Sequence, residues 1–153
     1  MKKIALLLTF NLVLQNIFAQ TSTWEMLGPI AFPTNISGQI NGIGRVSQIK
    51  WDPQNSNTLY ACSASGGFYK STDNGFNWTL LGTDFLPRMA TSSCCIDHTN
   101  SNVIYLSSGD ANYYGADLGI WKTTNGGVSW VQINNGIGNN MALEMLIDPS
   151  NNQ

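Results

Sequence analysis

Charged residues are scarce in this chain of 153 residues, which has seven lysines and arginines, nine acidic residues and a formal net charge of −2. Phosphate binding needs clustered basic side chains, so the composition argues against a nucleic-acid partner. The single histidine, His98, excludes a Ser-His-Asp or Cys-His arrangement, because it occupies a predicted turn. Three cysteines are too few for a disulfide framework and lack metal-ligand spacing. Either they are buried as small apolar residues, or Cys62 bridges one of the adjacent pair Cys94 and Cys95.

Long apolar stretches are missing beyond the N-terminus. Lys2 and Lys3 precede an apolar stretch at residues 4–14, and a small residue, Ala19, follows at a plausible cleavage point. This stretch is shorter than the ~20 residues that span a bilayer, and no later segment qualifies. The sequence therefore predicts a signal peptide at residues 1–19, no membrane span, and a mature chain that starts near Gln20 and is secreted or held at the cell surface.

An internal repeat is the most informative feature that is present. Residues 49–82 and 95–134 resemble each other, with Trp78 and Trp130 lying 52 positions apart, and a third copy begins at Met145. Repeats of this length are typical of units that bury their apolar faces by stacking on copies of themselves.

Each copy reads as four short strands joined by tight turns. They are expected at residues 45–51, 58–63, 67–71 and 78–81, and again at 89–96, 103–107, 118–123 and 130–133. Four-stranded units of this size are blades of a β-propeller, and no helical periodicity competes with that interpretation. The predicted fold is all-β: two complete four-stranded blades with partial flanking strands.

The repeat also divides the chain. Blade 1 is expected at residues 44–88, blade 2 at 89–138, and the start of a truncated blade 3 at 139–153. Because Trp24 lies 54 positions before Trp78 in a similar context, residues 20–43 are expected to add a strand that closes the last blade, followed by a linker. A propeller has typically ~4–8 blades, so the chain is expected to be an N-terminal fragment whose partners include the remaining blades.

The turn before each fourth strand carries the sharpest motif. An acidic or amide side chain can accept hydrogen bonds from the backbone of its own turn, glycine permits positive φ, and the tryptophan packs between neighbouring sheets. The residues are Ser71, Asp73, Gly75 and Trp78 in the first copy, and Thr123, Asn125, Gly127 and Trp130 in the second.

With these motifs, residues 44–78 and 101–130 resemble BNR/Asp-box repeat propellers, in particular secreted bacterial proteins with a sortilin-like N-terminal propeller. The resemblance implies a propeller and export. It also implies that Asp73 and Asn125 are structural, because Asp-boxes lie at the end of the propeller opposite the usual binding face. It does not fix an activity, since such scaffolds include sialidases, xyloglucanases, receptor ectodomains and assembly factors.

The opposite end, here called the top face, receives the loops between second and third strands and those between blades. The first such loop is minimal, at residues 64–66, whereas the second expands to residues 109–117. Insertions in repeat proteins tend to map to the binding face. The candidate ligand-binding residues are therefore Asp110, Asn112, Tyr113, Tyr114 and Asp117.

Two interpretations of this loop remain open. Tyrosine can stack on a sugar ring, and Asp110 and Asp117 can bind hydroxyl groups or Ca²⁺. Alternatively, the loop is a solvated turn whose tyrosines pack on the blade. It is not an EF-hand, because Tyr114 and Trp121 replace two of the ligands. No metal site or cofactor is predicted, with calcium the one weak possibility.

Catalytic signatures are hard to find. A sialidase clamps its substrate with three arginines, but the chain has only Arg45 and Arg88. Xyloglucanase-like propellers carry an aspartate just before the Gly-Gly of an early blade, where this chain has Ala64 and Ser65. We therefore assign no catalytic residue and expect a non-catalytic scaffold that binds or adheres to glycan or protein through its top face. The alternative is a fragment of a BNR-type glycoside hydrolase, sialidase- or xyloglucanase-like, in which the partner of Asp110 lies beyond residue 153.

Overall fold

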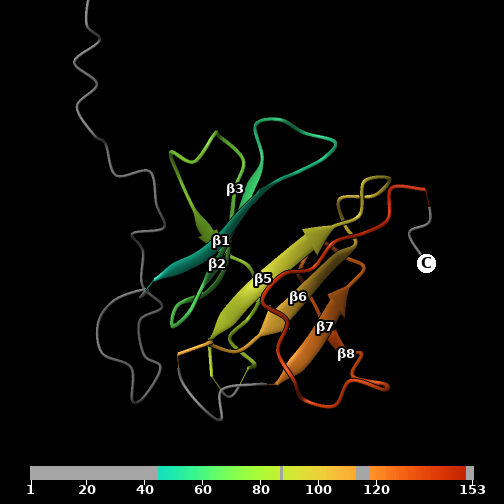
Figure 1. Cartoon of the computed structure of the whole chain (residues 1–153). Helices are drawn as coiled ribbons and strands as arrows, with labels where there is room; N and C mark the ends of the chain where they lie inside the picture. Colours follow the sequence, from blue (N-terminus) through green and yellow to red (C-terminus); the bar gives the residue numbers. More distant parts are fainter. Residues whose placement is uncertain (1–44, 87, 113–117, 151–153) are drawn as a thin grey trace, which may run out of the picture.

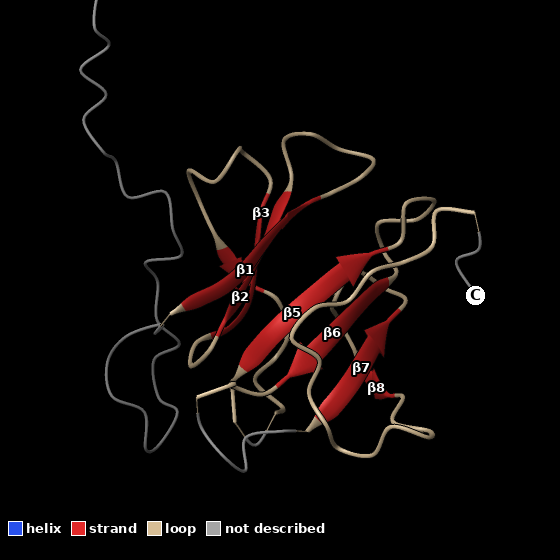
Figure 2. Cartoon of the chain, in the orientation of Figure 1, coloured by secondary structure: helices blue, strands red, loops and turns tan. Residues whose placement is uncertain are grey.

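The computed structural model describes residues 45–86, 88–112 and 118–150, and Figures 1 and 2 show their arrangement. These residues form eight strands and no helix, in two four-stranded antiparallel sheets with the strands in sequence order. The prediction of an all-β chain built from four-stranded blades is confirmed. The strands are β1 (Val46–Trp51), β2 (Leu59–Ser63), β3 (Gly67–Ser71), β4 (Thr79–Leu80), β5 (Thr91–Ile96), β6 (Ile104–Ser108), β7 (Gly119–Thr123) and β8 (Val131–Gln132).

The two sheets repeat one another in register as well as in order. Each first strand pairs with its second through one irregularity, between Val46 and Gln48 in blade 1 and between Thr91 and Ser93 in blade 2. The fourth strands are one residue shorter than predicted at each end: Trp78 and Trp130 still belong to the preceding turn, and the strands end at Leu80 and Gln132. The repeat in the sequence therefore corresponds to a repeat in the backbone.

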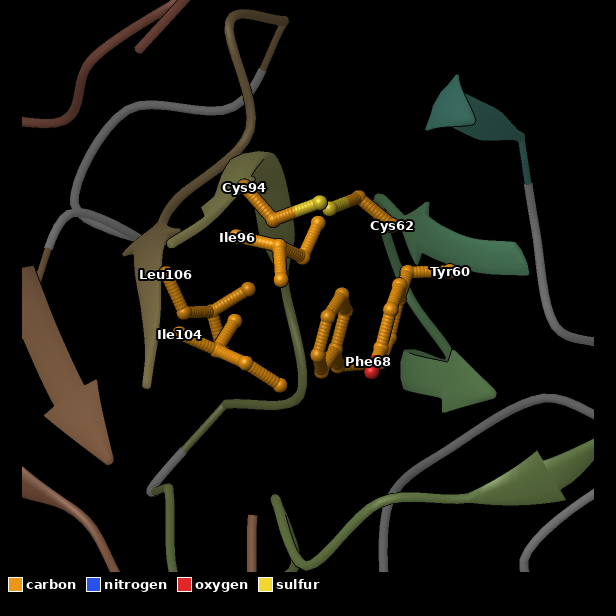
Figure 3. Packing of buried hydrophobic residues seen from close by; sticks show 7 residues of the cluster. All are labelled: Tyr60, Cys62, Phe68, Cys94, Ile96, Ile104 and Leu106. Carbon is orange, nitrogen blue, oxygen red and sulfur yellow. The ribbon is translucent and has the colours of Figure 1, made fainter. Parts of the chain in front are cut away.

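The apolar core lies between the two sheets, and Figure 3 shows its seven central side chains. Alternate residues of a strand share a face, so each blade contributes one face of its inner strands. Burial of each large side chain there stabilises the fold by about 1.5–3 kcal/mol. The members are Tyr60, Cys62 and Phe68 from blade 1 and Cys94, Ile96, Ile104 and Leu106 from blade 2, with Leu81, Trp121 and Trp130 packed around them.

Hydrogen bonds fix how the blades dock. The buried Thr91 hydroxyl, at the start of β5, accepts from the backbone N–H of Ser63 at 2.9 Å and lies 2.8 Å from the carbonyl oxygen of Gly67. The backbone N–H of Cys94 donates to Gln48 Oε1 on β1 at 2.7 Å. A buried backbone group without a partner would cost about 1–3 kcal/mol, so these bonds specify one alignment of the two sheets.

One turn of blade 2 recurs near the end of the described residues. Asp148 Oδ1 accepts hydrogen bonds from the backbone and hydroxyl of Ser150 at 2.8 and 2.7 Å. Asp97 does the same for Thr99, with both distances 2.7 Å. The sheets lie within the ranges predicted for blades 1 and 2, although the division into domains stays a prediction. Residues 1–19 and 20–43, including Trp24, lie outside the described residues.

Across the residues that the structure describes, we find no helix with the length and apolar character needed to cross a membrane.

Candidate functional site

The top face carries a hollow of about 300 Å³ that both blades line. Its walls come from the start of β1, the β2–β3 turn, the start of β5 and the segment after β6, which meet because the blades stack in register. A volume near 300 Å³ is at the small end of ligand sites, enough for part of a sugar chain. The lining residues are Arg45, Val46, Ser47, Ala64, Thr91, Ser92, Gly109, Asp110, Ala111, Asn112 and Leu143.

An ion pair between the blades dominates the chemistry of this hollow. Arg45 Nη2, before β1, lies 2.6 Å from Asp110 Oδ1, after β6. The same carboxylate oxygen accepts from the backbone N–H of Asn112 at 3.0 Å. The Arg45 side chain is 49% exposed and that of Asp110 only 15%, so the carboxylate is held in place while the guanidinium remains reachable. Charged groups held this way form strong hydrogen bonds with hydroxyl-rich ligands.

The structure brings together only part of the predicted binding loop. Asp110 and Asn112 line the hollow, whereas Tyr113, Tyr114 and Asp117 lie outside the described residues. A calcium ion on Asp110 Oδ1 would compete with the Arg45 guanidinium for that oxygen. Among the described residues, no group of three or more His, Cys, Asp or Glu side chains is placed to hold a metal.

Several residues that line the hollow were not predicted from the sequence as ligand-binding residues. Arg45, Ser47, Thr91 and Leu143 come from segments far apart in the chain, and only the stacking of the blades brings them to one hollow. Arg45 was considered as one of too few arginines for a sialidase, and the structure pairs it with Asp110. Ala64 also lines the hollow, and it belongs to the Ala64-Ser65 pair that stands where the resemblance to xyloglucanase-like propellers implies an aspartate.

The first motif turn joins β3 to β4 at the end of blade 1 opposite the top face. Asp73 Oδ1 accepts from the Ser71 hydroxyl at 2.8 Å and from the backbone N–H of Asn77 at 2.9 Å. Asp73 Oδ2 accepts from Asn77 Nδ2 at 2.6 Å, and the N–H of Gly75 donates to Ser71 Oγ at 2.8 Å. The carboxylate therefore closes its own turn.

The second motif turn, between β7 and β8, repeats this pattern without a charge. Asn125 Oδ1 accepts from the Thr123 hydroxyl at 2.8 Å and from the backbone N–H of Ser129 at 3.0 Å. The N–H of Gly127 donates to Thr123 Oγ1 at 3.0 Å. An amide oxygen replaces the carboxylate oxygen because the turn requires an acceptor and no charge.

The two motif tryptophans have different neighbours. The Trp78 indole donates to the carbonyl oxygen of Gly75 at 2.8 Å. Trp130 instead meets Phe68 of blade 1 edge to face, with ring centroids 6.0 Å apart. Trp130 thus packs against the preceding sheet, as predicted for such a residue. Both indoles are half-buried.

We expect the charge of Asp73 to make the first turn acid-sensitive. Hydrogen bonds from the backbone of Asn77, then from its side chain and Ser71, hold the pKa of Asp73 below its usual range. A depressed folded-state pKa contributes stability above the unfolded value of about 3.9, and this is lost as pH falls through the folded pKa. The variant Asp73→Asn should therefore lose less thermal stability than the parent between about pH 5 and pH 2. Melting curves across this range measure the slope.

The second turn supplies the matched control. Asn125→Asp places a carboxylate in the same hydrogen-bond pattern. Its thermal stability should therefore fall more steeply than that of the parent between about pH 5 and pH 2. Equal slopes for the parent, Asp73→Asn and Asn125→Asp would contradict a role for these carboxylates in acid sensitivity.

Stacked four-stranded antiparallel sheets with a shared apolar interface define the chain as a β-propeller type of structure, and solved structures agree. It superposes on an ancestral GH74 enzyme with a TM-score of 0.53 and 28% identity, covering 64% of this chain and 11% of that one. The GH74 enzyme of Niastella koreensis matches with a TM-score of 0.51 and 24% identity, over 65% of this chain and 15% of that one. That second likeness concerns the fold alone.

Sequence comparison points in the same direction. In an alignment of 103 residues, the chain is 27% identical to a xyloglucanase of Hypocrea jecorina (strain QM6a). The match covers 58% of this chain and 12% of that protein. No protein-family model matches the chain. The chain thus spans about an eighth of the length of the curated relative that it matches.

These comparisons overturn the main functional prediction. The leading prediction, a non-catalytic scaffold for binding or adhesion, is wrong, because the similar proteins are a xyloglucanase and GH74 enzymes. They favour the alternative, a glycoside hydrolase. The prediction failed because the missing arginines, and the missing aspartate at Ala64 and Ser65, were given more importance than the similarity of the whole repeat.

Proposed function

We propose that this chain forms two blades of a β-propeller glycoside hydrolase that acts on a β-glucan of the xyloglucan type. The observation that carries this proposal is the 27% identity to a xyloglucanase over 103 residues. The likeness to the ancestral GH74 enzyme, at 28% identity, supports it with both sequence and fold. Fold alone would not, because propellers serve many functions.

In this proposal the hollow on the top face contacts the polysaccharide. A glucan chain is rich in hydroxyl groups, and Asp110 offers a carboxylate acceptor beside the donor Arg45. Ala64 and Leu143 add apolar surface for the faces of sugar rings. The hollow thus combines a few fixed polar groups with small apolar walls, as carbohydrate and small-molecule sites do.

The catalytic pair is not complete in this hollow. Glycoside hydrolysis by the usual mechanism needs two carboxyl groups flanking the scissile bond. Among the described residues that line the hollow, Asp110 is the only carboxylate. Ala64 cannot supply the second one, so we propose that Asp110 binds and orients substrate, with the acid and base on other elements.

We also propose that the protein is exported and that its motif turns are Asp-boxes of the BNR type, as in sortilin-like bacterial propellers. The lysine-led apolar segment at residues 1–19 supports export, because it has the composition of a secretory signal. The paired turns at Asp73 and Asn125 support the Asp-box assignment through their shared hydrogen bonds. Both features suit an enzyme that meets a polymer outside the cell.

The decisive experiment measures hydrolysis by the protein that carries this chain at its full encoded length. We expect reducing sugars to be released from xyloglucan at least about tenfold faster than from starch, because an α-glucan presents a differently shaped chain to the same cleft. A sialoside reporter and mixed-linkage β-glucan complete the panel. Release from the sialoside with none from any β-glucan would contradict the proposal.

Removing the charge of Asp110 tests its role in that enzyme. Hydrogen bonds to charged groups contribute about 1.5–3 kcal/mol, so Asp110→Asn should lower kcat/KM on xyloglucan by about 10- to 100-fold. The same substitution breaks the ion pair with Arg45, so the guanidinium loses its fixed position and kcat/KM should fall further. Asp73→Asn removes a carboxylate at the opposite end of blade 1 and should leave kcat/KM unchanged. Equal effects of the two substitutions would mean that Asp110 acts through general stability.

A further inference from the structure

Two cysteines from different blades meet in the centre of the apolar core. Cys62 lies on β2 and Cys94 on β5, and both are fully buried. The two thiols interact, and Figure 3 shows their sulfur atoms beside each other across the interface. Cys94 is anchored by its backbone N–H to Gln48, the residue that pairs with Cys62 in the β1–β2 ladder. The two thiols are therefore positioned by strands as well as by packing.

The third cysteine is placed differently although it is next in sequence. Successive side chains of a strand point to opposite faces, so Cys95 faces away from blade 1. It pairs with Tyr105 across β5 and β6 and is partly exposed. Cys95 therefore lies outside the pair formed by Cys62 and Cys94 and serves as an internal comparison for it.

We propose that Cys62 and Cys94 form a disulfide that covalently joins blade 1 to blade 2 when the protein folds in an oxidising compartment. The reaction is a thiol–disulfide exchange: a small-molecule or protein disulfide accepts two electrons and leaves as two thiols, and one S–S bond forms between Cys62 and Cys94. In the cell this rests on the proposed export, because disulfides persist in oxidising compartments. The pairing itself rests on the packing of the blades.

The bridge has to close during folding. In the folded chain the hydrogen bond to Cys62, and then burial, raise the pKa of Cys94 well above its usual range. Exchange requires a thiolate that the oxidant can reach, and neither sulfur is accessible once the blades have docked. The reduced folded protein should therefore resist oxidised glutathione, whereas the refolding chain should react with it.

The test uses the variant Cys95→Ser, because trypsin leaves Cys94 and Cys95 in one peptide, residues 89–122, and Cys62 in another, residues 51–70. The protein at its full encoded length, in this variant, is unfolded, refolded in a buffer of reduced and oxidised glutathione, alkylated in denaturant and digested. We expect most molecules to yield the two peptides joined, with a mass two hydrogens below their sum. The same variant kept reduced should yield both peptides alkylated.

Stability gives a second measurement on the same variant, with Cys94→Ser as the matched control. A disulfide between residues 32 positions apart restrains the unfolded chain, so oxidation should raise the melting temperature of Cys95→Ser by about 5–10 °C. Cys94→Ser, which keeps Cys62 and Cys95, should show neither the joined peptides nor the shift. Two alkylated or glutathione-modified thiols in refolded Cys95→Ser, or equal joining in Cys94→Ser, would overturn the proposal. Because the oxidant is supplied and no glucan is present, this result is independent of the proposed hydrolase activity.

Discussion

Replacing Phe68 with alanine is expected to lower the free energy of unfolding by about 3–5 kcal/mol, the range for deleting a fully buried aromatic ring. Phe68 is 0% exposed at the centre of the interface between the blades. Its ring stacks on Tyr60 with centroids 5.7 Å apart and meets Trp130 edge to face at 6.0 Å. Alanine would leave a cavity bordered by both sheets, because neighbouring strands are hydrogen-bonded and cannot close onto it. Denaturant unfolding with a constant m-value measures the loss.

The control for this prediction is the nearby Phe76, in the turn after β3. Phe76 is 70% exposed, so Phe76→Ala should change stability by less than about 0.5 kcal/mol. Equal losses for Phe68→Ala and Phe76→Ala would mean that the two sheets do not share a core in solution.

Replacing Gly127 with alanine should destabilise the fold by about 2–5 kcal/mol, combining backbone strain with overpacking. Gly127 adopts a φ of 92°, a conformation that favours glycine. A Cβ there would lie 2.5 Å from Leu81 Cγ, at the end of blade 1. The new methyl group would therefore push apart the β7–β8 turn and the blade on which it packs.

Gly136 separates the two contributions. It has a φ of 83°, and a Cβ there would meet nothing within 4 Å. Gly136→Ala therefore carries the backbone strain alone and should cost about 1 kcal/mol. If thermal or denaturant unfolding gave the two variants the same loss, the close approach of Gly127 to Leu81 would have no energetic importance.

The sequence predicts the fold well because its signals are local and repeated. β3 (Gly67–Ser71) has its predicted ends, since glycine marks its start and the serine of the motif turn marks its end. The fourth strands were predicted to begin one residue too early, because Trp78 and Trp130 have strand propensity but complete the turn. Local propensity identifies the strand, whereas tertiary hydrogen bonds set where pairing begins.

The site was harder to predict because its residues converge only after the blades stack. The expanded loop identified Asp110 and Asn112, but nothing in the sequence links Asp110 to Arg45, 65 positions earlier. Leu143, which also lines the hollow, comes from a segment that follows blade 2 in the sequence. The functional prediction failed for a different reason. The absence of three arginines, and of an aspartate at Ala64 and Ser65, was interpreted as evidence against catalysis, although a site shared among many loops does not depend on a few positions.

The ion pair between Arg45 and Asp110 also links ligand occupancy to the cohesion of the two blades. Each partner belongs to a different blade, so a ligand that binds both side chains associates only with the docked state. By mass action such a ligand stabilises that state by about 2.7 kcal/mol when its free concentration is a hundred times its Kd. If the proposed activity and export hold, a polysaccharide bound there would join the two blades non-covalently, and this region would resist unfolding most where that polysaccharide is abundant.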